Sequence, residues 1–231
     1  MIDLHGFGNQ LLLGAVMTVG LALSACALGL VLGLLGAVSK LSKIKALVWP
    51  AEIYTTVFRG IPELLIVLII YFGSSGILTA IGESFGYDEY IELSPFMAGV
   101  ISLGVVFGAY ATEVFRGAII AIPVGQIEAA TAYGMSPWMT FKRVIMPQIW
   151  RVALPGLGNL FLVLQKDTAL VSVIGLEELT RKAAFATGFT KAPFTFYLTA
   201  AFIYLALTSV SMYGQSRAER WASRGTRGLS S

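Results

Sequence analysis

The chain has 231 residues, of which 56% are hydrophobic and only 13% charged, and its mean hydropathy is +0.78. Soluble domains carry about 25% charged residues, so the composition excludes an ordinary soluble domain, excludes a disordered chain, and indicates an integral membrane protein. The formal net charge of +3 is typical of Lys and Arg gathered in cytoplasmic loops and does not call for a nucleic-acid partner. Cys26 and His5 are the single cysteine and histidine, which excludes a disulfide framework and a histidine-based metal site.

Five apolar stretches are long enough to cross a bilayer, which needs about 20 apolar residues in a helix. The sequence therefore predicts an all-α integral membrane protein with about five transmembrane helices in a single domain over residues 1–231. The first stretch does not look like a cleaved signal peptide, because residues 1–10 lack Lys and Arg and include Asp3. The expected spans are residues 11–38, 46–81, 96–122, 152–176 and 194–213.

Charges in the connecting loops predict the orientation of these spans. The loops after the first and third spans and the C-terminal tail are basic, whereas the loop after the second span is acidic and the one after the fourth is mixed. The positive-inside rule then places the N-terminus in the periplasm and the C-terminus in the cytoplasm. The basic residues are Lys40, Lys43, Lys45, Lys142, Arg143, Arg151, Arg217, Arg220, Arg224 and Arg227.

Charge inside a predicted span is costly and marks either function or structural pairing, and six residues are the candidates for such a role. Glu113 and Arg116 are three residues apart on one helix face and can pair. The other four are Arg59, Glu63, Lys166 and Asp167, and for all six the alternative role is snorkelling or packing. Gly60 and Pro62 beside Arg59 predict a break in the helix.

The segment 123–147, between the third and fourth spans, is long for an idle hairpin loop and is rich in apolar and aromatic side chains. Residues 126–133 favour a short helix, which Gly134 and Pro137 end. Such a helix either offers a contact site to another protein or rests on lipid at the membrane interface.

This segment carries the pattern Glu128-Ala129-Ala130-x3-Gly134-x9-Val144-Ile145-Met146-Pro147. It resembles the EAA loop of ABC-importer permeases in full spacing, with Val144 and Met146 as conservative departures. Further motifs around Arg59, Glu113 and Lys166-Asp167 are similar to the polar amino-acid uptake subfamily. Within it the chain is most similar to the Q-type subunits of histidine/lysine/arginine/ornithine and opine permeases.

The resemblance implies the fold of a type I ABC-importer permease, with a cytoplasmic coupling helix between spans 3 and 4. It assigns docking on a partner ATPase to Glu128, Ala129, Ala130, Ala132, Tyr133 and Gly134. The chain has no phosphate-binding loop, so we expect no cofactor and no enzyme activity in it, and ATP and Mg bound by a separate ATPase dimer. A periplasmic binding protein is expected to deliver the substrate.

The same resemblance implies that the pathway is shared with a second homologous permease subunit. Many relatives carry Asn-Glu where this chain has Asn159-Leu160, which favours a heterodimer whose other subunit supplies the carboxylate. The candidates for lining the pathway are Glu113, Asn159 and Gln165.

The leading interpretation is therefore an ABC permease for polar amino acids in the bacterial inner membrane. Basic amino acids or opines are the expected substrates, and neutral or acidic polar amino acids the alternative. A self-sufficient ion-coupled secondary transporter or channel explains the intramembrane carboxylates but not the EAA spacing. A membrane-embedded enzyme has no nucleophile motif to support it.

Overall fold

The structure of the protein is a computed structural model that describes residues 4, 6–87 and 92–223. Between turns, this described part is helical throughout and contains no strand. The elements are α1 (Gly8–Leu41), α2 (Lys45–Gly60), α3 (Glu63–Ser84), α4 (Pro95–Ile120), α5 (Val124–Ala132), α6 (Pro137–Thr140), the π-helical segment η1 (Phe141–Ile145), α7 (Met146–Asp167), the 3₁₀ segment η2 (Thr168–Ile174), α8 (Leu179–Thr190) and α9 (Pro193–Ala222).

Five helical segments in the described residues are long and apolar enough to cross a membrane, which confirms the all-α membrane fold predicted from composition. Their bounds differ from the expected ones at several ends. The five segments are Gly8–Leu41, Glu63–Ser84, Pro95–Ile120, Pro137–Ile174 and Pro193–Ala222.

The second apolar stretch, expected over residues 46–81, is two helices and not one. The break expected around Gly60 lies at Ile61 and Pro62, which both have extended backbone with ψ of 136° and 134°. Proline has no N–H to donate and disfavours helical geometry in the residue before it, so α2 ends here and α3 begins at Glu63. Only α3 has the length and composition of a span.

The fourth span begins earlier than the expected residue 152. Helical structure continues from Pro137 through η1 into α7, so the end of the expected 123–147 loop already belongs to this segment. Ser136 caps the segment, since its Oγ accepts a hydrogen bond from the Met139 amide at 3.3 Å. Lys166 and Asp167, expected in mid-span, lie in the last turn of α7, where the helix tightens into η2.

Close packing of α1 on α4 forms the centre of the fold. Gly33 faces Ala111, and a Cβ built at Gly33 would lie 2.6 Å from the Ala111 Cβ. A Cβ at Gly29 would lie 2.8 Å from the carbonyl oxygen of Gly104. Small residues at these contacts let the two backbones approach closely. Membrane helices depend on such van der Waals packing, because lipid tails are as apolar as Leu side chains and the hydrophobic effect does not drive helices together.

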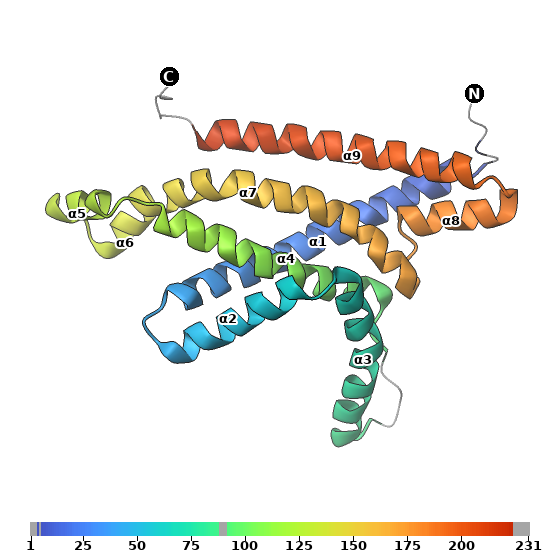
Figure 1. Cartoon of the computed structure of the whole chain (residues 1–231), viewed down its shortest axis with the longest axis horizontal. Helices are drawn as coiled ribbons and strands as arrows, with labels where there is room; N and C mark the ends of the chain where they lie inside the picture. Colours follow the sequence, from blue (N-terminus) through green and yellow to red (C-terminus); the bar gives the residue numbers. More distant parts are fainter. Residues whose placement is uncertain (1–3, 5, 88–91, 224–231) are drawn as a thin grey trace.

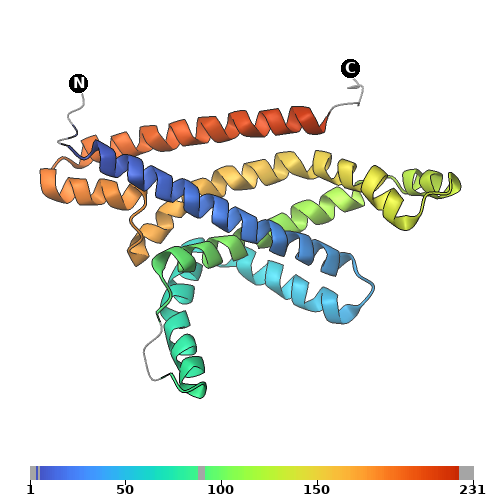
Figure 2. The same cartoon turned by 180° about the vertical axis from the view of Figure 1, so that it is seen from behind.

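The remaining helices are arranged around this pair (Figure 1). Helices α7 and α9 run side by side along one edge, and α2 returns along α1. α5 and α6 lie at one end of the molecule, and α8 lies at the other, near the start of α1. α3 points away from the other helices, and the reverse view in Figure 2 shows α1 crossing in front of α4 and α7.

A second, smaller core lies at the α8 end, where the start of α1, α8 and the start of α9 meet. Phe196 is fully buried there and receives the ring of Phe7 edge-on at 5.8 Å. The buried apolar members are Leu11, Leu179, Ala183, Ala186, Phe196 and Ala200. This core holds α8 against the ends of two spans.

Candidate functional site

The predicted docking segment lies at one extreme of the molecule and is mostly exposed (Figure 1). The helix expected over residues 126–133 is α5, Val124–Ala132, which packs on α6 and η1. Ala130 is buried, so it belongs to the packed side of α5. The exposed docking candidates are Glu128, Ala129, Ala132, Tyr133 and Gly134.

Gly134 ends α5 in a left-handed turn, with φ of +77°. The Gly134 amide donates to the Thr131 carbonyl at 2.9 Å, and the Met135 amide donates to the Ala130 carbonyl at 3.1 Å. These two bonds form a Schellman motif, whose left-handed position favours glycine. A Cβ at Gly134 would meet nothing within 4 Å of this chain, so within the subunit its backbone conformation, not crowding, requires glycine.

The exposed face of this region carries large apolar side chains. Tyr133 is 87% exposed, and Trp138 is 69% exposed and stacked on Phe141 with ring centroids 5.9 Å apart. Exposed aromatic side chains on a short, well-capped loop are typical of a protein contact site.

A cavity of about 210 Å³ lies between α3, α4 and α7 and contains two carboxylates. Glu63, from the first turn of α3, and Asp167, from the last turn of α7, both line it. Tyr110 adds a ring and a hydroxyl, and the remaining walls are apolar: Leu103, Val106, Phe107, Leu160, Val163 and Leu164. The helix break before Glu63 thus brings one intramembrane acid of the sequence beside another.

Arg59 lies over the ring of Tyr110. Its guanidinium carbon is 5.3 Å from the centroid of the Tyr110 ring, within cation–π range. Tyr110 therefore contacts a cation of α2 and also lines the acidic cavity. Tyr110 belongs to the motif around Glu113 that is similar to the polar amino-acid uptake subfamily, but no functional role was predicted for it from the sequence.

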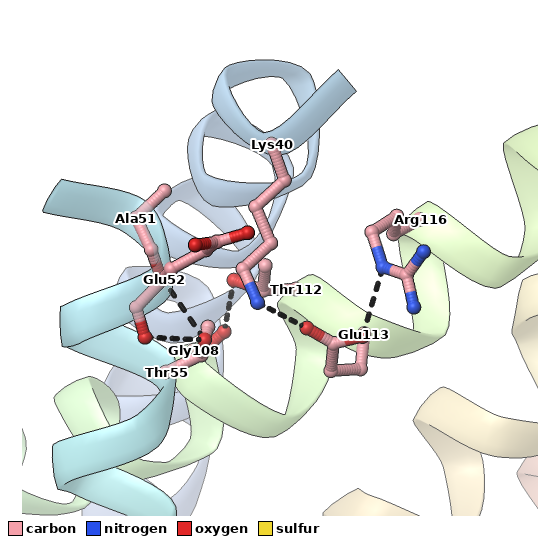
Figure 3. Close-up of polar contacts among 8 residues, drawn as sticks. All are labelled: Lys40, Ala51, Glu52, Thr55, Gly108, Thr112, Glu113 and Arg116. Atoms are coloured by element: carbon pink, nitrogen blue, oxygen red, sulfur yellow. Dashed lines mark hydrogen bonds and ion pairs between the residues drawn. The ribbon is translucent and has the colours of Figure 1, made fainter. Parts of the chain in front are cut away.

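Glu113 is held by two cations of its own chain (Figure 3). Lys40 Nζ, at the end of α1, donates to Oε1 at 2.6 Å, and Arg116 Nε donates to Oε2 at 2.9 Å. The expected pairing of Glu113 with Arg116 is confirmed. Because both carboxylate oxygens accept from these cations, Glu113 is paired within its own subunit.

The other two pathway candidates lie on different faces of α7. Gln165 is 2% exposed, and its Oε1 accepts a hydrogen bond from Ser211 of α9 at 2.8 Å. Asn159 is exposed and shares one stripe of α7 with Lys166. The exposed members of that stripe, spaced by three and four residues, are Val152, Pro155, Asn159, Val163 and Lys166.

A buried carboxylate at the α8 end was not predicted. Glu178 is fully buried and caps α8, with its carboxylate accepting from the amides of Thr180 at 2.9 Å and Arg181 at 2.7 Å. Tyr204 of α9 donates to the same group at 3.0 Å, and Thr18 of α1 approaches it at 3.5 Å. Burial raises the pKa of the Glu178 carboxyl above its ordinary value, although the hydrogen bonds act in the opposite direction. An acid directly before a helix is a sequence signal for such a cap, but no helix over residues 179–190 was predicted from the sequence.

Among residues 4, 6–87 and 92–223, no group of three or more His, Cys, Asp and Glu side chains could hold a metal ion.

Comparison with known proteins assigns a family. Residues 29–224 match the family described as “Binding-protein-dependent transport system inner membrane component”. The chain is 50% identical to the nopaline transport system permease protein NocQ of Agrobacterium fabrum over 223 residues, covering 96% of this chain and 94% of the relative. It is 44% identical to the histidine/lysine/arginine/ornithine transport system permease protein HisQ of Salmonella typhimurium, covering 90% and 91%. Identity to the arginine ABC transporter permease protein ArtQ of Escherichia coli is 43%, covering 91% and 93%.

Solved structures agree with these relatives. A chain from the “Crystal structure of an amino acid ABC transporter with histidines” aligns with a TM-score of 0.79 at 35% identity, covering 95% of this chain and 99% of that one. A chain of the inward-facing MetNI methionine ABC transporter aligns with a TM-score of 0.73 at 19% identity, covering 93% and 97%. The second similarity shows the fold alone, and it is the fold of an ABC-importer permease.

Proposed function

Since the chain belongs to the family of binding-protein-dependent transport system inner membrane components, we propose that it is the permease subunit of an ATP-driven ABC importer for polar amino acids. Basic amino acids or opines are the proposed substrates, and a periplasmic binding protein delivers them. The relatives are named as permeases for nopaline, for arginine, and for histidine, lysine, arginine and ornithine.

The observation that carries the substrate proposal is the cavity between α3, α4 and α7. Two carboxylates, Glu63 and Asp167, meet there among apolar walls, and the charge suits a cationic amino acid. A charged hydrogen bond in such surroundings contributes about 1.5–3 kcal/mol, enough to select a cation over a neutral analogue. The apolar walls accept the aliphatic part of a side chain.

The size of the cavity supports a pathway shared by two permease subunits. At about 210 Å³ it is smaller than the roughly 300–1,000 Å³ of typical ligand pockets, so one chain holds part of a site. The exposed stripe of α7 that contains Asn159 and Lys166 provides a surface for a second subunit. A heterodimer with a homologous permease is the arrangement we propose.

In this proposal, the partner ATPase docks on α5, and the effect of ATP binding reaches the permease through that contact. The sequence lacks a phosphate-binding loop, so ATP and Mg bind to a separate ATPase dimer, and docking falls to the exposed surface around Ala132 and Tyr133. In this proposal the α5 end lies in the cytoplasm with the C-terminus, and the N-terminus lies in the periplasm, as the loop charges favour. ATP binding shifts the permease pair between inward- and outward-facing states by differential affinity.

The substrate proposal is tested by neutralising each acid in the reconstituted transporter. Glu63→Gln and Asp167→Asn are expected to raise the KM for arginine at least about tenfold, because each removes a charged hydrogen bond. Glu83→Gln is the matched control, since Glu83 is an exposed carboxylate near the other end of α3. Unchanged KM for arginine in both cavity variants would contradict the proposed cation site.

A further inference from the structure

A basic pocket lies between the start of α7 and the end of α9, distant from the acidic cavity. Its volume is about 660 Å³, and its walls come from two segments far apart in the sequence. Neither docking nor the proposed transport pathway uses it. The lining residues are Lys142, Met146, Pro147, Trp150, Arg151, Trp221 and Ala222.

Two cations of the pocket are available to an anion. The Nε of Arg151 donates to the carbonyl oxygen of Ala222 at 3.1 Å, which ties α9 to α7 and holds the guanidinium at the pocket wall. No carboxylate lines the pocket, and within the described ranges neither Lys142 nor Arg151 forms an ion pair. The pocket therefore has uncompensated positive charge.

The other walls suit a lipid and not a small free anion. Trp150 is 38% exposed and is held edge-on against Phe115, and Trp221 is 68% exposed across the pocket. Tryptophan at the end of a span is typical of the membrane–water interface, where its apolar ring and N–H both find partners. Met146 and Pro147 continue the apolar surface along α7.

The position of the pocket relative to the membrane-length segments also supports a lipid ligand. Lys142 lies before α7 and Trp221 in the last turn of α9, so the pocket is at the end of two membrane-length segments. Figure 1 shows α5 and α6 at the start of α7. Basic pockets between transmembrane helices at this depth bind anionic lipid headgroups. The pocket itself does not depend on the proposed substrate, and only the choice of leaflet rests on the proposed orientation.

We propose that this pocket binds the phosphate headgroup of one anionic phospholipid of the cytoplasmic leaflet, with Lys142 and Arg151 on the phosphate and Trp150 and Trp221 beside the glycerol and upper acyl chains. The bound lipid links the start of α7 to the end of α9, next to the docking segment.

Native mass spectrometry of the assembled transporter, titrated with phosphatidylglycerol or phosphatidylcholine, tests this proposal. Phosphatidylglycerol is expected to remain bound while phosphatidylcholine does not, and inorganic phosphate is expected not to displace it. Lys142→Gln should weaken phosphatidylglycerol binding about fivefold, the factor for one basic side chain near an anionic surface. Arg143→Gln, the exposed neighbour that does not line the pocket, should leave binding unchanged.

The double variant Lys142→Gln with Arg151→Lys removes the positive charge at position 142 and keeps one at position 151. It therefore avoids the folding defect that neutralising Arg151 would risk. Equal phosphatidylglycerol retention by the wild type and by the Lys142→Gln variant would overturn the proposal. Disulfide crosslinking, under an added oxidant, of a Met146→Cys variant to a cysteine introduced in a partner subunit would also overturn it, because the pocket would then be a protein interface. Neither readout depends on arginine uptake, so the substrate proposal can fail or hold separately.

Discussion

Lys40 and Glu113 lie 73 positions apart in the sequence, yet their side chains join the end of α1 to α4 through a 2.6 Å ion pair (Figure 3). Arg116 completes the cluster from the other side of the carboxylate. The side chains of Lys40 and Glu113 are 14% and 23% exposed, so water screens the pair only partly. The cluster lies directly beyond the close contacts of Gly33 and Gly36 with α4, and it fixes the same two helices.

This cluster predicts a structural and not a selective role for Glu113. A double-mutant cycle of Lys40→Met and Glu113→Gln should give a coupling energy of about 1–2 kcal/mol in thermal unfolding of the purified complex. The single variants should retain the wild-type preference between arginine and neutral amino acids. Zero coupling, or a change of substrate preference in Glu113→Gln alone, would contradict this role.

Close packing of α1 on α4 predicts that position 33 tolerates no side chain. Gly33→Ala places a Cβ 2.6 Å from the Ala111 Cβ, so the helices must separate, at a cost of about 1–3 kcal/mol. Gly20→Ala is the control on the same helix, because its Cβ would meet nothing within 4 Å. Thermal unfolding should show a lower Tm for Gly33→Ala only, and equal Tm values for both variants would refute the packing argument.

The turn after α5 predicts that Gly134 is needed for its backbone conformation. An ordinary residue in the left-handed region costs about 1–2 kcal/mol, whereas asparagine adopts it more easily. Gly134→Asn should therefore preserve ATPase association and uptake better than Gly134→Ala, measured by co-purification and transport. If both variants lose association equally, close approach of the partner backbone is what requires glycine.

Glu178 and Glu177 predict opposite pH dependences of stability. Burial raises the pKa of Glu178, so its stabilising contribution is complete below the ordinary carboxyl pKa and is lost as pH rises through the raised value. The hydrogen bond from Lys182 lowers the pKa of the exposed Glu177, whose smaller contribution is present at neutral pH and is lost as pH falls. Glu178→Gln should flatten the decline of Tm with rising pH, while Glu177→Gln should affect only the decline of Tm with falling pH. If the Glu178→Gln variant keeps the wild-type slope of Tm against pH, a group other than Glu178 is responsible for the pH dependence.

Features set by local sequence were predicted correctly. The helix break at Pro62 follows from proline geometry, the pairing of Glu113 with Arg116 follows from helical spacing, and α5 follows from its composition and from Gly134. The left-handed turn at Gly134 was also within reach, because glycine directly after a helix is a common C-terminal signal. Membrane-span counting succeeded since hydropathy is a local property as well.

Relationships between distant segments were not predictable. Glu178 meets Thr18 across 160 positions and Tyr204 of another helix, and a sequence without tertiary contacts gives no register between those helices. For the same reason, the sequence could not predict that Glu63 and Asp167 line one cavity, or that Lys40 pairs with Glu113. The burial of Gln165 against Ser211 likewise depends on how α9 packs.

Arginine uptake into proteoliposomes most directly tests whether the chain is an ATP-driven permease. The vesicles would contain this chain with its candidate partner permease and ATPase, with the binding protein supplied on the side opposite the ATPase. Uptake should require ATP, the ATPase and the binding protein together, and Ala132→Asp on the exposed face of α5 should abolish it. Uptake by this chain without the ATPase, driven by an ion gradient, would contradict the proposed function and favour a secondary transporter.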